Sequence, residues 1–217
     1  MSDVGVKICG LRSHAQIDSA IAAGASYIGL NFFAKSPRSV TIAEATPLAA
    51  AMPFGVAKVA LVVNPDNAML DALAAQVAID IIQLHGSETP DRVTEVKTRY
   101  GLPVMKVVGV ADADDLPQLD TYAHVADMLL VDAKPPKGAD LPGGNGLAFD
   151  WRLIANRRWP VPWMLAGGLN PDNVAEAIKM TGAPIVDVAS GVESAPGIKD
   201  PAKMAAFVAN ARGVPCI

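Results

Sequence analysis

Short apolar runs recur along the whole chain, and many of their residues are β-branched, as is typical of buried strands. Alanine-rich segments with apolar residues at helical spacing lie between these runs, for example at 14–21 and 173–178. A strand followed by a helix, repeated eight times, predicts a parallel sheet with helical crossovers. The predicted strands are Val4–Cys9, Tyr27–Phe32, Ala57–Val63, Ile81–Leu84, Val104–Val108, Met128–Val131, Trp163–Ala166 and Ile185–Val188.

The spacing of the predicted strands indicates how the sheet closes. Most strands follow one another at close to the minimum spacing for a strand, a helix and two turns, but longer insertions occur at 33–40 and 133–148. Both insertions follow a strand, so both lie at the carboxyl-terminal rim. Eight units favour a closed α/β (β/α)₈ barrel, the TIM barrel, over an open doubly wound sheet with fewer strands. We expect one such catalytic domain over residues 1–217, with its site at that rim.

Residues at the predicted helix ends agree with this division. Ser13 follows the first strand and is a candidate N-cap, because its hydroxyl can accept a hydrogen bond from a free backbone N–H. Gly24, Gly101 and Gly182 stand where helices should end, since glycine adopts the left-handed conformation of a C-cap without strain. Strand and helix patterns therefore predict the same boundaries.

The composition of the chain indicates a small ligand. The chain has 18 Lys and Arg against 22 Asp and Glu, and its basic residues are spread singly. This balance argues against a nucleic-acid surface and against a polybasic membrane patch. An uninterrupted apolar run of about 18 residues, which would indicate a membrane span, does not occur. We expect a small-molecule substrate, no nucleic acid and no membrane, in a monomer or a homodimer.

The two cysteines, Cys9 and Cys216, stand near opposite ends of the chain. No CxxC or Cys/His spacing accompanies them, so we expect neither a disulfide framework nor a metal site. The first residues lead into a strand without the basic segment and long apolar stretch of a signal peptide. A cytoplasmic location fits both features.

Cys9 ends the first predicted strand directly before Gly10. Most free cysteines are simply small buried apolar residues. At the last strand position of a barrel, however, a thiol faces the cavity at the rim and can act as a nucleophile or a base if its pKa is lowered. Lys7 lies two residues earlier on the same face of the strand and is our candidate for stabilising the thiolate.

Three further polar residues follow predicted strands. Asp132 closes the sixth apolar run, either as a cap or partner of Lys134, or as a general acid or base tuned by partial burial. Arg38 stands behind Pro37 in the long second loop, and is either solvated or a clamp for a substrate carboxylate. His85 follows the fourth strand, where it lines the site or binds a backbone carbonyl.

Glycine-bearing turns follow the last two predicted strands. Gly167 and Gly168 follow the seventh strand, and Ser190 and Gly191 follow the eighth. Each can be an ordinary tight turn, but neighbouring turns at this place in a barrel bind phosphate through backbone N–H groups. The loop 134–146, rich in proline and glycine, is either a lid over the site or a disordered connection.

The motifs at these positions resemble those of phosphoribosylanthranilate isomerase, a TIM-barrel family of tryptophan biosynthesis. The resemblance covers nearly the whole chain, in the family's order, with one departure: Asn145 stands where the family usually has threonine. The motifs are Lys7–Gly10, Gly29–Phe33 with Ser36–Arg38, Gln83–Gly86, Leu130–Asp132, Phe149–Trp151, Leu165–Leu169 and Asp187–Glu193.

This resemblance implies a cofactor-independent Amadori rearrangement of N-(5-phosphoribosyl)anthranilate, a phosphorylated aldose, to the ketose. It implies that Asp132 is the general acid that opens the ribose ring and that Cys9 is the general base. Arg38 is implied to hold the anthranilate carboxylate, and the glycine turns the phosphate. His85 and Asp187 match polar family residues near the site.

Two other functions are compatible with the same barrel. A Schiff-base aldolase would use Lys58 or Lys106, on the third and fifth predicted strands, as its nucleophile. A non-catalytic barrel would only bind a phosphorylated sugar. Borohydride trapping distinguishes the aldolase, and substitution of Cys9 by serine distinguishes a catalyst from a binding protein.

Overall fold

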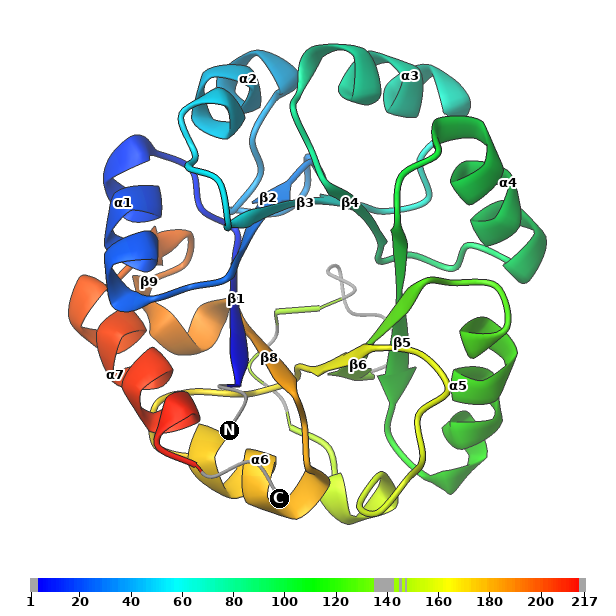
Figure 1. Cartoon of the computed structure of the whole chain (residues 1–217), viewed down its shortest axis with the longest axis vertical. Coiled ribbons are helices and arrows are strands. Elements are labelled where there is room, and N and C mark those ends of the chain that lie inside the picture. The colour runs from blue at the N-terminus through cyan, green and yellow to red at the C-terminus, as the bar shows by residue number, and fades with distance from the viewer. Residues whose placement is uncertain (1–3, 135–142, 145, 147, 215–217) are drawn as a thin grey trace.

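The computed structural model describes residues 4–134, 143, 144, 146 and 148–214. Its parallel strands form a closed eight-stranded barrel in the order of the sequence, β1 next to β8, and helices form an outer ring (Figure 1). The predicted TIM barrel is therefore confirmed. The strands are β1 (Gly5–Cys9), β2 (Tyr27–Asn31), β3 (Ala57–Val62), β4 (Ile81–Leu84), β5 (Val104–Val110), β6 (Met128–Ala133), β7 (Trp163–Leu165) and β8 (Ile185–Val188).

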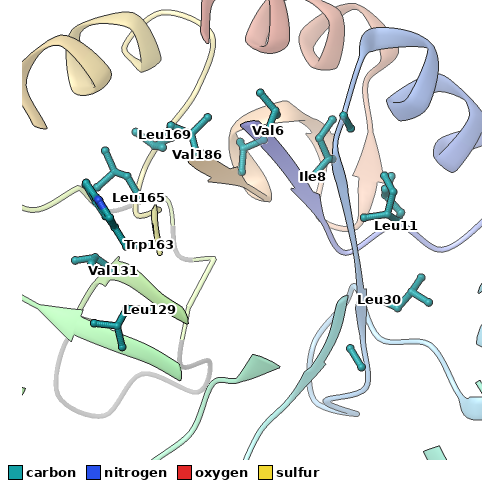
Figure 2. Close-up of a cluster of buried hydrophobic side chains, with 14 of the residues drawn as sticks. Val6, Ile8, Leu11, Leu30, Leu129, Val131, Trp163, Leu165, Leu169 and Val186 are labelled. Atoms are coloured by element: carbon teal, nitrogen blue, oxygen red, sulfur yellow. The ribbon is translucent and has the colours of Figure 1, made fainter. Parts of the chain in front are cut away.

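Each strand divides its side chains between two cores because successive residues point to opposite faces. Val6 and Ile8 of β1 belong to the larger core between the strands and the helices (Figure 2). Lys7 and Cys9 alternate with them and face the barrel interior. A smaller apolar cluster fills that interior and includes Val59, Ile81, Met105, Val107, Leu130, Met164 and Ala166.

The helix ends follow the predicted chemistry. The Ser13 side chain accepts a hydrogen bond from the backbone N–H of Gln16, and Gly24, Gly101 and Gly182 are left-handed C-caps. No helix that the structure describes is long and apolar enough to cross a membrane. The α-helices are α1 (His14–Ala23), α2 (Ile42–Ala50), α3 (Asn67–Gln76), α4 (Pro90–Tyr100), α5 (Leu116–Ala123), α6 (Val174–Thr181) and α7 (Pro201–Arg212).

Two features of the fold differ from the predicted alternation. Between β6 and β7, the described residues contain only a 3₁₀ turn, η2 (Trp151–Leu153), so a helix after every strand is wrong there. Pro160 and Pro162 follow this turn, and proline does not extend a helix. After β8, the short 3₁₀ helix η3 (Ser190–Val192) leads into an unpredicted antiparallel hairpin, β9 (Glu193–Ala195) and β10 (Ile198–Lys199). These strands are too short to show a periodic pattern.

The last helix, α7, completes the outer ring of helices by packing against α1 and β1. Phe207 of α7 is completely buried, so we expect Phe207→Ala to lower the free energy of unfolding by about 3 to 5 kcal/mol, through lost apolar burial and the cavity left behind. Urea unfolding measures this change. Met180→Ala on α6, where the side chain is exposed, is the control and should change stability by less than about 0.5 kcal/mol.

Candidate active site

A cavity opens among the loops at the carboxyl-terminal ends of the barrel strands. Eight of the nine predicted site residues line this cavity: Cys9, Arg38, His85, Asp132, Gly167, Gly168, Asp187 and Ser190. The ninth, Gly191, does not. The closure of the barrel brings them together from six βα units, as strand ends at one rim must converge.

Cys9, Lys7 and Asp187 form a group at the β1–β8 junction. Lys7 is fully buried, and its ammonium donates a hydrogen bond to Asp187 Oδ1 at 2.8 Å. Lys7 and Asp187 are direct partners in the parallel register of β1 and β8, so the barrel itself sets this ion pair. Burial alone would lower the pKa of Lys7, but Asp187 and Cys9 raise it, and the net direction is upward. Lys7 therefore carries a positive charge beside the thiol.

The surroundings of Cys9 shift its pKa in opposite directions. Burial raises the pKa of the thiol, Lys7 and Lys199 lower it, and Asp187 raises it. The net direction is upward. Lys7 does favour the thiolate as predicted, but its charge is largely balanced by Asp187 and does not overcome burial. The thiol is accordingly protonated at neutral pH in the absence of ligand, and it is a strong base once ionised.

Asp132 is the second-to-last residue of β6 and faces His85. Its Oδ1 accepts the backbone N–H of Ala133 at 2.8 Å, and its Oδ2 lies 3.4 Å from His85 Nε2. Gln83 Nε2 lies 3.2 Å from the other ring nitrogen, Nδ1. Where the Gln83 amide donates this bond, a neutral His85 carries its proton on Nε2, which lies near Asp132 Oδ2 without a hydrogen bond to it. Asp132 thus has a proton-bearing neighbour in the cavity.

The contacts of Asp132 and His85 do not match the simpler interpretations, in which Asp132 pairs with Lys134 and His85 binds a backbone carbonyl. Lys134 pairs with Asp115 at 2.5 Å, not with Asp132. His85 contacts the side chains of Gln83 and Asp132, while none of its hydrogen bonds to the described residues is to a backbone carbonyl.

Gly143 covers the Asp132–His85 pair from the loop after β6. A Cβ atom there would lie 2.6 Å from His85 Nε2 and 2.7 Å from Asp132 Oδ2, so only glycine allows this approach. The remainder of the predicted lid, residues 135–142 and 145, lies outside the described residues, and this includes Asn145. The loop residues that are described therefore border the cavity.

Arg38 is buried and ion-paired instead of solvated. Its Nε donates to Glu193 Oε1 at 2.7 Å and its Nη2 to Glu193 Oε2 at 2.9 Å. Glu193 also accepts from Lys199 at 2.8 Å. One edge of the predicted carboxylate clamp is therefore occupied by a protein carboxylate. Glu193 and Lys199 were not predicted, and the only signal for them is that Glu193 ends the Asp187–Glu193 motif.

The glycine turns after β7 and β8 lie next to each other at the cavity. Gly167 and Gly168 have φ of 87° and 64°, a conformation that favours glycine. A Cβ at Gly191 would lie 1.9 Å from the carbonyl oxygen of Leu169, so Gly191 joins the two turns without lining the cavity. The described residues contain no group of three or more His, Cys, Asp or Glu that could hold a metal ion.

The two lysines considered for a Schiff base are placed unfavourably. Lys58 lies near the start of β3, away from the carboxyl-terminal rim, with its ammonium 3.5 Å from Asp80. Lys106 is buried in β5, and its ammonium donates to Glu88 and to two backbone carbonyls. Neither residue lines the cavity, so the structure does not support the aldolase alternative.

Comparison with known proteins agrees with this geometry. A protein of Ruegeria sp. (strain TM1040) named N-(5'-phosphoribosyl)anthranilate isomerase is 64% identical over 215 residues, which are 99% of this chain and 100% of that protein. A structure of monomers generated from dimeric phosphoribosylanthranilate isomerase of Thermotoga maritima has a TM-score of 0.84 and 32% identity, covering 97% of this chain and 100% of that one.

A second solved phosphoribosylanthranilate isomerase is bound to reduced 1-(o-carboxyphenylamino)-1-deoxyribulose 5-phosphate. It has the same TM-score of 0.84 and 32% identity, and covers 97% of this chain and 100% of that one. The family model for N-(5'-phosphoribosyl)anthranilate (PRA) isomerase matches residues 6–210. The chain therefore belongs to the PRA isomerase family.

Proposed function

We propose that this chain isomerises N-(5-phosphoribosyl)anthranilate to 1-(2-carboxyphenylamino)-1-deoxyribulose 5-phosphate, a step of tryptophan biosynthesis, with Asp132 as acid and Cys9 as base. The observation that supports this most directly is the presence of a buried thiol and a carboxylate in one cavity, with an arginine and two glycine turns available for the substrate's two anionic groups. Family membership supports the reaction itself.

Asp132 acts first in this mechanism. In its protonated form it donates a proton to the ribose ring oxygen, which weakens the bond from that oxygen to C1 and opens the ring. Ring opening converts the anilino nitrogen into an iminium, whose positive charge acidifies the hydrogen on C2. His85 Nε2, 3.4 Å from Asp132 Oδ2, is placed to stabilise the carboxylate that remains.

Cys9 then removes the C2 proton as the thiolate. The raised pKa of this thiol makes the thiolate scarce, yet basic enough to abstract a carbon-bound proton. The resulting enolamine tautomerises to the ketose. Each turnover leaves a proton on Cys9 and none on Asp132, so one proton transfer from the thiol to the carboxylate restores the pair. No covalent bond to sulfur forms at any step, and a free thiol of this kind fits the cytoplasm.

The substrate's two anionic ends have separate binding groups at the rim. Arg38 meets the anthranilate carboxylate, while the backbone N–H groups of the turns at Gly167–Gly168 and Ser190–Gly191 meet the phosphate. Asp187 acts indirectly by holding Lys7 beside the thiol. Binding at both ends fixes the ribose between Asp132 and Cys9.

Substitution of the two reacting groups tests the mechanism. We expect Cys9→Ser and Asp132→Asn each to lower kcat by about 10²- to 10⁴-fold, the usual contribution of a general acid or base. The assay follows the loss of fluorescence of freshly generated phosphoribosylanthranilate. Both variants should still bind the reduced product analogue, which shows that the site is intact. Near-normal turnover in either variant would refute that residue's role, and an inactive parent protein would favour the non-catalytic barrel.

The ionisation of Cys9 predicts a pH dependence. Because alkylation needs the thiolate and the pKa of Cys9 is raised, the rate of iodoacetamide alkylation of Cys9 should increase with pH beyond about 8.5, the ordinary pKa of cysteine, and decrease toward acid. Removing Lys7 removes a charge that lowers this pKa. In Lys7→Met, thiolate formation should therefore shift to higher pH, as measured by the iodoacetamide alkylation rate in a Cys216→Ser background. An alkylation profile identical to that of the parent would exclude Lys7.

The assembly of the chain is a second, independent question. We infer a homodimer formed through the amino-terminal end of the barrel, where Phe54 is fully exposed beside a hollow lined by Met52, Val56 and Ala78. An exposed aromatic side chain next to a recess on the same face can be complementary to a second copy. The Thermotoga maritima relative is described as dimeric.

Light scattering after size exclusion tests this assembly. We expect the mass of a dimer for the parent protein and of a monomer for Phe54→Glu. Met180→Glu on α6, another exposed apolar position, serves as control and should leave the mass unchanged. A parent protein that is monomeric at micromolar concentration would contradict the dimer.

A further inference from the structure

Glu193 and Lys199 form a buried ion pair in the hairpin after β8. They are register partners across β9 and β10, and the Lys199 ammonium donates to Glu193 Oε1 at 2.8 Å. Arg38 donates to the same carboxylate through Nε and Nη2, from the loop after β2. One carboxylate thus binds two cations, and all three side chains are almost excluded from water. The proposed mechanism assigns no task to Glu193 or Lys199.

With Lys199 protonated, this cluster of Arg38, Glu193 and Lys199 has one positive charge in excess. Burial lowers the pKa of Lys199 and the Glu193 carboxylate opposes this shift, with a net downward direction. Burial alone would raise the pKa of Glu193, but Arg38 and Lys199 lower it below its ordinary value, so the carboxylate is ionised. An uncompensated charge is costly to bury, and stability alone would be served by one cation for one carboxylate. Arg38 lines the cavity, so the excess charge lies where an anionic ligand group can compensate it.

The geometry of Arg38 also depends on Glu193. The two parallel hydrogen bonds fix the plane of the guanidinium group, because a fork of this kind allows little rotation. Nη1, the remaining nitrogen, has no acceptor among the described residues. It lies on the side of the loop after β6, where a Cβ at Gly144 would come within 2.9 Å of it. Glu193 therefore presents Nη1 in one orientation at the cavity.

Lys199 links this cluster to the turn after β8. Besides Glu193, its ammonium donates to the carbonyl oxygen of Ala189 at 2.8 Å. Ala189 lines the cavity and directly precedes Ser190. One buried ammonium therefore joins the orientation of Arg38 to the position of the turn that we assign to the phosphate.

We propose that Glu193 and Lys199 are positioning residues for the substrate's aromatic carboxylate. Glu193 holds Arg38 by one edge so that Nη1 points at the substrate carboxylate. Lys199 supplies a second positive charge, so the cluster stays positive although the Glu193 carboxylate balances one of the two cations. This role rests on the proposed function, since it requires a substrate that has a carboxylate. It places part of substrate recognition in a hairpin that is not itself a barrel element.

Binding of two matched ligands tests this role. The first ligand is reduced 1-(o-carboxyphenylamino)-1-deoxyribulose 5-phosphate, and the second is the same molecule with phenyl in place of carboxyphenyl. We expect Glu193→Gln and Lys199→Met to weaken calorimetric binding of the first by about tenfold or more, the effect of impairing one charged hydrogen bond. Binding of the second should change less than about twofold.

A control variant and a double variant separate positioning from general damage. Lys203→Met removes an ammonium whose one hydrogen bond within the described part of the chain is to the backbone carbonyl of Glu193, and should leave both affinities unchanged. In an Arg38→Met background, Glu193→Gln should have no further effect, because its effect passes through Arg38.

The outcomes distinguish this inference from the proposed function. Equal weakening of both ligands would show that the hairpin only supports the fold, and unchanged binding of both would show no role, so either result overturns the inference. If the parent protein binds neither ligand, the proposed function itself fails. Selective loss of the carboxylate ligand supports both.

Discussion

The burial of charged side chains inside a closed barrel is the constraint on which the site depends. Each charge taken from water needs a partner of opposite sign, and the parallel register supplies Asp187 of β8 for Lys7 of β1. The same burial keeps the Cys9 thiol protonated in the empty site. At the rim, Glu193 also pairs with buried cations, but here two cations, Arg38 and Lys199, share one carboxylate. The Lys7–Asp187 pair is thus balanced in charge, whereas the cluster around Glu193 carries one positive charge in excess.

Much of this arrangement could be predicted because it follows from local patterns. The alternation of Val6 and Ile8 with Lys7 and Cys9 has a period of two, so the sequence alone indicates which pair faces the interior. A closed barrel then places every strand end at one rim, which is why Cys9 and Asp132 could be assigned to a common cavity without any contact being known. Short βα units left little room for other topologies.

The remaining features depend on contacts between distant segments. The bond from Arg38 to Glu193 spans 155 positions, and nothing near either residue indicates the other. The β9–β10 hairpin has strands of three and two residues, too short for periodicity, and turns at Pro196–Gly197. The prediction of a helix between β6 and β7 was wrong for the described residues, because the spacing between strands measures chain length and not conformation. Pro160 and Pro162 account for the missing helix, but their effect could be recognised only once the boundaries of η2 were known.

The protonation of Cys9 connects these electrostatic arrangements to the order of the proposed reaction. Lys7 and Lys199 both lower the pKa of the thiol, but each is held by its own carboxylate, so together they do not overcome burial. An additional positive charge appears only when ring opening converts the substrate nitrogen into an iminium. That charge arises next to the carbon whose proton Cys9 removes, and an adjacent cation favours the thiolate. The thiol then passes its proton to the carboxylate that the acid step has left on Asp132, so ionisation of the base follows the acid step and the site needs no permanently charged thiolate to perform the second proton transfer.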